Sequence, residues 1–311
     1  METFNQTFSI KFILLGLSDV LYLQVFFFIV FLLMYMITLS SNLLLILVVR
    51  INPTLKTPMY FFLSNLSVID ICFSTCIIPK VLVNTLSKDR SISLMACSIQ
   101  MYVHLAMGAV ESMLLAIMAY DRFVAICRPL HYNATMNKKI CTCLVSMAWS
   151  IGFLNSFILV TPVLKLPFCR SNHVNHFFCE IPPFLQMSCK DPWTNVIVIY
   201  ISAVVIVMCS FFLTLISYIH IISSILNIRS SQGRCKTFST CASHLVVVTI
   251  YYGTIIFMYI RPPTTHYPQT DKMVSLVYTA VTPMLNPFIY SIRNKEVKGT
   301  FKCNNIGKSH L

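Results

Sequence analysis

Long apolar runs, separated by short polar segments, follow one another along almost the whole chain. Each run is long enough for an α-helix that crosses the hydrocarbon core of a bilayer, which takes about 20 residues. The short alternating strands of a membrane β-barrel are not visible in the sequence. The pattern therefore predicts an all-α fold, a bundle of seven transmembrane helices. The predicted spans cover residues 23–49, 58–83, 97–126, 140–162, 194–226, 238–260 and 271–291.

The composition agrees with a membrane protein. Of the 311 residues, 57% are hydrophobic and only 11% are charged, and the mean hydropathy is +0.75. Soluble proteins carry about 25% charged residues, so this chain lacks the polar side chains to cover a water-facing surface. The first apolar run is too long for a signal-peptide core and has no basic leader, so we expect it to be retained as a span.

The charges predict the orientation of the bundle. With the N-terminus outside, the cytosolic segments hold 14 of the 23 basic residues and only two of the 10 acidic ones. This matches the excess of Lys and Arg on the cytosolic side of membrane proteins. The net charge of +13 is then explained by topology and anionic lipid, and no nucleic-acid partner is expected. We expect one receptor domain (1–311) with an extracellular tail (1–22), a helical bundle (23–291) and a cytosolic tail (292–311).

The outer segments carry candidate modifications. Asn5 begins a glycosylation sequon in the extracellular tail. The matching sequons at Asn65 and Asn133 fall in a span and on the cytosolic side, so we expect neither to be used. Four cysteines lie outside, where the oxidising environment favours disulfides, but the sequence alone does not choose among the three pairings. A zinc site using His173 and His176 is the weaker alternative, because the spacing fits no standard zinc motif.

Polar residues inside the spans are costly and point to function. Glu111 lies 11 residues before Arg122, and an α-helix turns about 100° per residue, so the two share a face roughly 16 Å apart along the axis. His104, seven residues before Glu111, and Gly108 fall on the same face. The third span therefore carries a polar stripe from its outer mouth to its inner end. Ordinary burial of a hydrogen-bonded histidine is the alternative for His104.

The stripe ends at an adjacent acid and base, Asp121 and Arg122, at the cytosolic mouth of the third span. One interpretation is a switch in which one charge holds the other. The other is a flanking charge pair that ends the helix and reaches water. The two residues alone do not decide between these interpretations.

Five ordered blocks decide it, because together they make the chain similar to olfactory receptors of the seven-helix, rhodopsin-like G-protein-coupled class. The resemblance runs from Asn5 to about Lys298. The blocks are Pro58–Ser67 with Asp70, Met118–Cys127, Ser217–Tyr218, Lys236–His244 and Pro283–Tyr290.

This resemblance implies the disulfides and the ligand site. Cys97 would pair with Cys179, and Cys169 with Cys189. A small volatile odorant would bind in an outer-half cavity between the third, fifth and sixth spans, with no cofactor and no catalytic residue. The residues implied to contact it are His104, Leu105, Gly108, Ala109, Ser112, Val205, Ile206, Tyr252, Ile255, Ile256 and Tyr259.

The resemblance also implies a signalling mechanism. Ligand would shift the population toward a state in which the Asp121–Arg122 pair opens and the sixth span swings outward. Arg122, Tyr218 and Tyr290 would then line a cleft for a stimulatory, olfactory-type heterotrimeric G protein, and cAMP would rise. A polar core would differ between the two states, formed by Asn42, Asp70, Glu111 and Asn286. That core is either a hydrogen-bonded network or a sodium site near Asp70 and Glu111.

The resemblance places the protein in the plasma membrane, in the cilia of olfactory neurons, with a short amphipathic helix in the cytosolic tail. The retained alternative is a rhodopsin-like receptor for a non-odorant small molecule in another tissue. A transporter would need internal repeats or half-helices, and an opsin would need a lysine in the middle of the last span. An enzyme is not expected, since no nucleophile elbow or metal-ligand pair is present.

Overall fold

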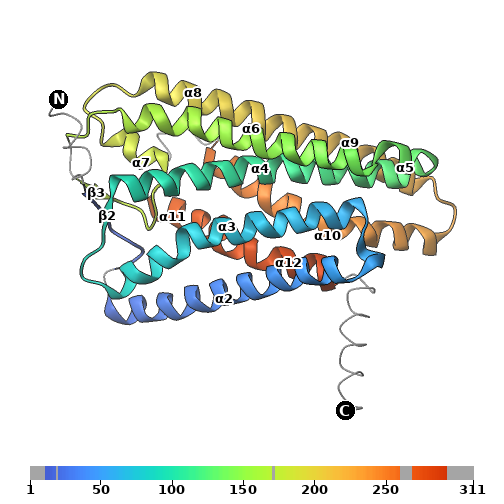
Figure 1. Ribbon diagram of the computed structural model, residues 1–311, viewed down its shortest axis with the longest axis horizontal. Helices are drawn as coiled ribbons and strands as arrows, with labels where there is room; N and C mark the ends of the chain where they lie inside the picture. The colour runs from blue at the N-terminus through green and yellow to red at the C-terminus, as the bar shows by residue number, and fades with distance from the viewer. Residues whose placement is uncertain (1–10, 19, 170–171, 260–267, 293–311) are drawn as a thin grey trace, which may run out of the picture.

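The structure is a computed structural model in which residues 11–18, 20–169, 172–259 and 268–292 are described. Long helices run side by side along the long axis of the molecule (Figure 1). Six are long and apolar enough to cross a membrane, and a seventh is added when a helix bent by 45° counts as one span. The predicted bundle of seven transmembrane helices is confirmed. The Asn5 sequon and the predicted amphipathic helix of the tail lie outside the described residues.

The helices begin and end close to the predicted spans. The first four are α2 (Leu21–Ile51), α3 (Pro58–Leu86), α4 (Leu94–Cys127) and α6 (Lys138–Leu164). The fifth span joins α8 (Trp193–Ala203), the π-helical η4 (Val204–Met208) and α9 (Cys209–Leu226). The sixth is α10 (Ser231–Tyr259), and the seventh joins α11 (Pro268–Leu276), the π-helical η6 (Val277–Val281) and α12 (Thr282–Ile292). The short connecting helices are η2 (Pro53–Leu55), η3 (Pro129–His131), α5 (Tyr132–Thr135) and α7 (Ile181–Gln186).

Local sequence signals explain where several helices start. The side chains of Ser93 and Asn137 accept hydrogen bonds from the first-turn amides of α4 and α6, as capping residues do. Proline occupies the first position of α3, where its missing N–H costs nothing. In the seventh span the helix widens to a π turn just before Pro283, which cannot donate to the helical ladder.

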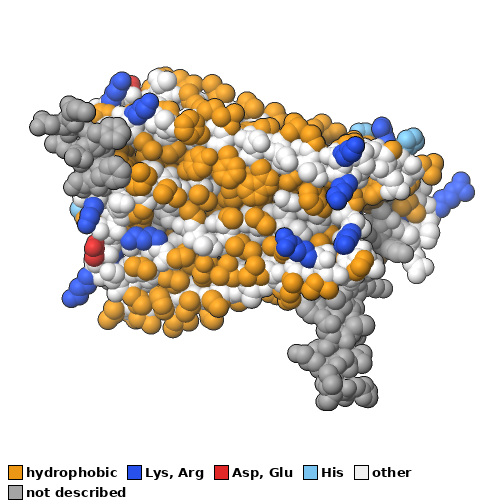
Figure 2. All heavy atoms as spheres, viewed as in Figure 1, with side chains coloured by type: hydrophobic (Ala, Val, Ile, Leu, Met, Phe, Trp, Pro, Cys, Tyr) orange, Lys and Arg blue, Asp and Glu red, His pale blue; other side chains and the backbone are white. Residues whose placement is uncertain are grey.

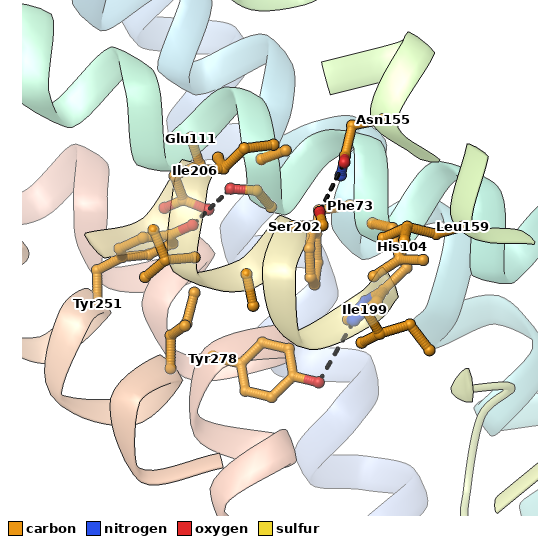
Figure 3. Close-up of a pocket in the computed structure, with 16 residues that line it drawn as sticks. Phe73, His104, Glu111, Asn155, Leu159, Ile199, Ser202, Ile206, Tyr251 and Tyr278 are labelled. Carbon is orange, nitrogen blue, oxygen red and sulfur yellow. Dashed lines mark hydrogen bonds between the residues drawn. The ribbon is translucent and has the colours of Figure 1, made fainter. Parts of the chain in front are cut away.

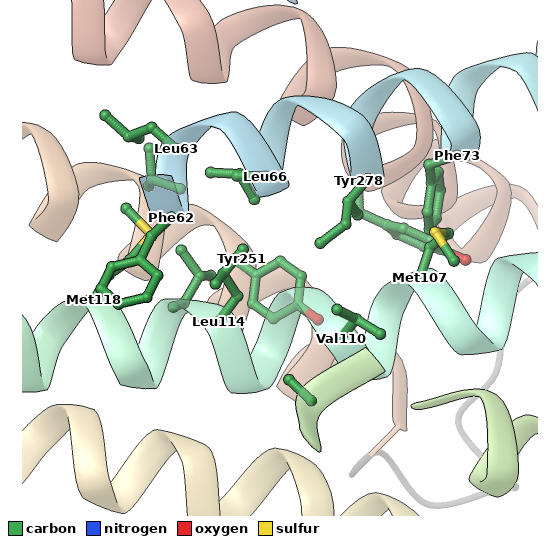
Figure 4. Close-up of a cluster of buried hydrophobic side chains, with 14 of the residues drawn as sticks. Phe62, Leu63, Leu66, Phe73, Met107, Val110, Leu114, Met118, Tyr251 and Tyr278 are labelled. Atoms are coloured by element: carbon green, nitrogen blue, oxygen red, sulfur yellow. The ribbon is translucent and has the colours of Figure 1, made fainter. Parts of the chain in front are cut away.

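Hydrophobic side chains cover the middle of the face shown in Figure 2, and Lys and Arg gather toward its two ends. Large apolar residues of α2 and of the fifth span are exposed, among them Phe26 and Leu213. Lipid tails, rather than water, suit such a surface. The inner face of the bundle is packed tightly, and Figure 4 shows α3 and α4 interlocked through Phe62, Leu66, Val110 and Met118.

The helix α4 is the axis of the bundle, since 67% of its apolar stretch is buried against 11% for α2. It approaches α6 closely at Gly152. A Cβ atom at that position would lie 2.5 Å from Cγ2 of Val110 and 3.0 Å from the carbonyl oxygen of Ala106. The absence of a side chain at Gly152 is therefore what lets the two helices pack.

A small three-stranded sheet lies at one end, beside the all-α bundle, and includes part of the expected extracellular tail. Its order is β2 (Ser91–Ser93), β1 (Lys11–Leu14), β3 (His173–Val174), with β1 antiparallel to β2 and parallel to β3. Residues 11–14 form the central strand because Phe12 and Leu14 point into a buried cluster while Lys11 stays exposed. The alternation of exposed and buried residues in this strand covers only four positions, so the sequence alone did not predict it.

Two disulfides lie at the same end and tie the long loop to the bundle. Cys97 at the start of α4 bonds to Cys179, and Cys169 bonds to Cys189. These are the pairs that the resemblance implies. The backbone amide of Cys179 also donates a 2.7 Å hydrogen bond to Oε1 of Gln100. We call this end of the molecule the outer end, and the end that carries Arg122 the inner end.

Candidate functional site

A cavity with a volume of about 90 Å³ lies in the outer half of the bundle (Figure 3). It is enclosed by side chains from α3, α4, α6, the fifth span, α10 and the seventh span. Its wall is mostly apolar, with a few polar groups, as is typical of small-molecule sites. The residues that line it are Phe73, His104, Leu105, Gly108, Ala109, Glu111, Asn155, Leu159, Ile199, Ser202, Ala203, Ile206, Val207, Tyr251, Ile255 and Tyr278.

Six of the residues expected to contact ligand line this cavity: His104, Leu105, Gly108, Ala109, Ile206 and Ile255. The helix α4 accounts for most of them. The polar stripe predicted from helical spacing also enters the cavity, because His104, Gly108 and Glu111 all lie on its wall. Arg122, the last member of the stripe, lies at the inner end of the same helix.

Four of the other expected residues, Ser112, Val205, Tyr252 and Ile256, are not among the described residues that line the cavity. Val205 is 54% exposed on the outer surface of the bundle, so its side chain faces away from this cavity. It belongs to the π turn η4, whose extra residue per turn changes which side chains face inward, and its neighbour Ile206 takes the inner position. Ile256 is half-buried and packs on the main core. The side chain of Tyr259 lies outside the described residues.

Ser112 and Tyr252 are buried beside the cavity rather than in its wall. The Tyr252 hydroxyl donates a 3.0 Å hydrogen bond to the carbonyl oxygen of Ser112. One residue earlier on α10, the Tyr251 hydroxyl donates a 2.5 Å bond to the carbonyl oxygen of Gly108, which does line the cavity. Two consecutive tyrosines of α10 are thus bonded to consecutive turns of α4.

Sequence reasoning missed most of the cavity wall outside α4 and α10. Asn155 and Leu159 come from α6, Ile199, Ser202 and Ala203 from α8, Val207 from η4, Phe73 from α3 and Tyr278 from η6. Tyr251 was missed in favour of its neighbour Tyr252. In the sequence, several of these residues stand out only as polar or aromatic positions within apolar runs. Such a position does not indicate whether the side chain faces the cavity or the lipid.

A polar group of side chains closes the outer end of the cavity. The Tyr278 hydroxyl donates a 3.2 Å hydrogen bond to Oε1 of Glu180 and lies 3.5 Å from Nε2 of His104. His176 in the long loop lies 3.7 Å from Glu180. Burial, assisted by the nearby charge of Lys272, lowers the pKa of His176 to about 3. Burial therefore favours the uncharged form of His176, while the nearby Glu180 carboxylate acts in the opposite direction.

The structure does not support zinc in this loop. Both disulfides consume the outer cysteines, so no thiolate is left to bind zinc there. Among the described residues, no group of three or more His, Cys, Asp or Glu side chains is arranged to hold a metal ion.

The four residues of the expected polar core are all buried, with Glu111 on the inner part of the cavity wall and the other three further toward the inner end. The Asn286 amide donates to both carboxylate oxygens of Asp70, at 3.1 and 3.2 Å. Glu111 also lies within bonding reach of Asn286. The Asn42 amide donates a 3.1 Å bond to the carbonyl oxygen of Pro283. The cluster therefore links α2, α3, α4 and α12.

At the inner end, Arg122 is held by its neighbour. Its Nη2 lies 2.6 Å and its Nε 3.1 Å from Oδ2 of Asp121, whose carboxylate is fully buried. Tyr218 of α9 forms a 2.7 Å hydrogen bond with Nδ1 of His244 on α10. Tyr290 of α12 is buried close to Tyr218 and Arg122. The pair is closed, and Tyr218 and Tyr290, the other two residues expected to line a cleft, lie near it.

Comparisons with known proteins agree with this arrangement. The family model described as olfactory receptor matches residues 31–305. The chain is 48% identical over 305 residues to olfactory receptor 5B12 of Homo sapiens, covering 98% of this chain and 97% of that protein. It is 45% identical to olfactory receptor-like protein OLF3 of Canis lupus familiaris (97% and 95% covered) and 46% identical to olfactory receptor 2B6 of Mus musculus (97% and 96% covered).

These matches extend over the cavity, the polar core and the charge pair alike. Receptors of this kind are multi-pass proteins of the plasma membrane and are not enzymes. With a seven-helix bundle, an outer-half cavity and a matching family model over residues 31–305, the chain belongs to the olfactory receptor family.

Proposed function

We propose that this chain is a single-domain odorant receptor that binds a small volatile molecule in the cavity and activates a stimulatory, olfactory-type heterotrimeric G protein, raising cAMP. One observation carries the proposal. The helix α4 lines the cavity with His104, Gly108 and Glu111 and bears the closed Asp121–Arg122 pair at its other end. A single rigid element thus joins a ligand-sized space to a charge pair facing the cytosol.

The apolar wall of the cavity suits small apolar ligands, and a ligand with eight or more carbons widens the space of about 90 Å³ that the closed state offers. Burial of each CH₂ group contributes about 0.8 kcal/mol, so a ligand with eight to ten carbons gains roughly 6–8 kcal/mol. The loss of translational and rotational freedom offsets at least about 4 kcal/mol of this gain. The remaining gain of about 2–4 kcal/mol corresponds to a dissociation constant of about 1 mM or weaker from apolar burial alone. Weak affinity suits a receptor that responds to changing concentrations of volatile compounds.

The two tyrosines of α10 supply a route from the cavity to the inner end. A ligand that displaces Tyr251 from the Gly108 carbonyl changes how α10 sits on α4. Tyr252, bonded to Ser112 one turn further in, carries the change along. Ligand acts by binding one state better than the other, which shifts the population between them.

The opened state exposes Arg122 together with Tyr218 and Tyr290. These side chains receive the C-terminal helix of the G-protein α subunit. The polar core of Asp70, Glu111, Asn286 and Asn42 lies between cavity and cleft, and it rearranges as a hydrogen-bonded network. The Asn286–Asp70 bonds of the closed state support this role. A sodium ion near Asp70 and Glu111 would stabilise the closed state in the same way.

The test measures ligand-evoked cAMP in cells that express the receptor and an olfactory-type α subunit. We expect a dose-dependent response to members of a broad odorant panel. Arg122→Ala should abolish it while surface expression stays at the wild-type level. A flat response to the panel despite robust surface expression would contradict the proposal and favour a receptor for a non-odorant small molecule. Full signalling by Arg122→Ala would remove that residue from the mechanism.

A further inference from the structure

One wall of the cavity carries a preformed polar pair. Asn155 on α6 and Ser202 on α8 both line the space and point toward each other in Figure 3. The Ser202 hydroxyl donates a 2.6 Å hydrogen bond to Oδ1 of Asn155. Because the two residues come from different helices, the bond fixes the orientation of the Asn155 amide within an otherwise apolar wall.

The polar groups that this hydrogen bond does not use determine what the pair can bind. Ser202 has one hydroxyl proton, and it is spent on Asn155. The carbonyl oxygen of Asn155 is the acceptor in that bond, so its free capacity is the NH₂ group with two donors. No hydrogen bond from this NH₂ group to another described residue is found. The pair therefore presents donors to the cavity.

The remaining polar groups of the wall are engaged elsewhere or lie at its ends. His104 lies at the outer end beside Tyr278, and its buried Nδ1 has no hydrogen-bond partner among the described residues. Tyr251 donates to the Gly108 carbonyl, and Tyr278 donates to Glu180. Glu111 lies at the inner end, next to Asn286 and Asp70. No Lys or Arg is among the described residues that line the cavity. A carboxylate ligand would lose its hydration without gaining a counter-charge, which is strongly unfavourable.

We infer that Asn155, held by Ser202, selects neutral aliphatic ligands with a carbonyl oxygen: ketones, aldehydes and esters. The Asn155 N–H groups donate to that oxygen, and the hydrocarbon chain packs against Leu105, Ile206 and Ile255. This inference rests on the proposed function, since it names the ligand class of the same cavity. It assigns the specificity to two residues outside the set that the sequence predicted.

The test uses compounds of matched chain length: octan-2-one, octanal, octane, octanoic acid and octylamine. We expect the two carbonyl compounds to act at concentrations about tenfold lower than the other three, because one hydrogen bond is typically worth that factor. The substitution Asn155→Leu keeps the side-chain size and should raise the half-maximal concentration of the ketone about tenfold. It should not weaken the response to octane, because the Leu side chain adds apolar contact to the same wall.

Two further variants separate hydrogen bonding from shape. Ser202→Ala frees the Asn155 amide to rotate and should weaken the ketone response by a smaller factor than Asn155→Leu. Leu159→Ile, which alters the shape of the same wall without touching a polar group, should change all five responses alike. A variant Asn155→Leu that keeps the preference for carbonyl compounds would overturn the inference.

The ranking of ligands distinguishes failure of the inference from failure of the proposed function. A preference for octylamine would mean that the ligand binds through the Glu111 carboxylate. A preference for octanoic acid or octane would mean that the ligand does not bind through the Asn155 amide donors. Either result overturns the inference and keeps the odorant receptor. A receptor that responds to other odorants but to neither carbonyl compound would also overturn the inference and keep the odorant receptor. Silence to every odorant with normal surface expression contradicts both.

Discussion

The hydroxyl of Tyr132 donates a 2.8 Å hydrogen bond to Oδ1 of Asp121, while Arg122 bonds to Oδ2 of the same carboxylate. Each oxygen of the buried acid thus has its own partner. Tyr132 begins the short helix α5, outside the bundle, so the cytosolic loop contacts the charge pair directly. Burial and the neighbouring Asp121 carboxylate raise the pKa of Tyr132, which keeps its hydroxyl protonated and able to donate.

This contact predicts that Tyr132→Phe raises signalling in the absence of ligand. A hydrogen bond to a charged group typically contributes about 1.5–3 kcal/mol. Loss of this bond leaves Arg122 as the sole partner of Asp121 among these two and favours the open state. The basal cAMP level, divided by the amount of receptor at the cell surface, should therefore rise about tenfold over wild type. The measurement is cAMP per surface receptor without added odorant.

The control for this variant is Tyr120→Phe. Tyr120 precedes the charge pair, is 42% exposed and has no hydroxyl hydrogen bond among the described residues. Its substitution should leave basal cAMP unchanged. Equal basal activity in Tyr132→Phe and wild type would show that the tyrosine does not stabilise the closed pair.

The sequence predicted the bundle well because bilayer thickness imposes long apolar runs with polar ends. The predicted span 97–126 became Leu94–Cys127, for example. The polar stripe on α4 was also predictable, since residues on one helix are related by a fixed rotation. Asn155, Ser202 and Tyr278 were not predictable, because the rotation of one helix relative to another depends on packing. Val205 lies outside the cavity wall for a local reason, as the π turn η4 shifts which residue faces inward.

The Cys97–Cys179 disulfide joins α4 to the outer loop. We predict that Cys97→Ser and Cys179→Ser each abolish surface expression. The Cys97–Cys179 bond closes a loop of 82 residues, and the other disulfide closes one of 20. The chain-entropy relation gives about 4.5 kcal/mol for the longer loop and about 3.3 kcal/mol for the shorter. Loss of the longer link should therefore be the more damaging, as measured by surface labelling of intact cells.

Cys72→Ser is the matched control, because Cys72 is an exposed free cysteine of α3. It should reach the surface like the wild type. Normal surface expression of either Cys97→Ser or Cys179→Ser would contradict the view that this disulfide holds the loop in place.

The close approach of α6 to α4 predicts that Gly152→Ala destabilises the receptor. The added Cβ would lie 3.0 Å from the carbonyl oxygen of Ala106, and backbone atoms in a packed bundle move little. Overpacking of this kind costs about 1–3 kcal/mol, so the melting temperature in detergent should fall. Gly253→Ala on α10 is the control, since its Cβ would meet nothing within 4 Å. A melting temperature equal to wild type in Gly152→Ala would mean that the helices separate freely at this point.

The buried His176 predicts that the outer loop loses stability as the pH falls. Its pKa is lowered from 6.5 to about 3 in the folded protein, chiefly by burial and secondarily by Lys272 and His104. The unfolded state binds a proton below pH 6.5 and the folded state does not, so this stabilising contribution is complete above pH 6.5 and declines toward pH 3. Each pH unit in that window costs about 1.4 kcal/mol, which is about 2 kcal/mol at pH 5.

The variant His176→Gln, which does not titrate, should remove this part of the pH dependence. Thermal melts of purified receptor at pH 7.5 and pH 5 measure it as the difference between variant and wild type. His173→Gln, at an exposed histidine of the same loop, should leave the wild-type pH dependence intact. If wild type and His176→Gln lost the same stability between the two pH values, the protonation of His176 would not be coupled to folding of the loop. Other buried histidines affect both proteins equally, so the comparison isolates this one side chain.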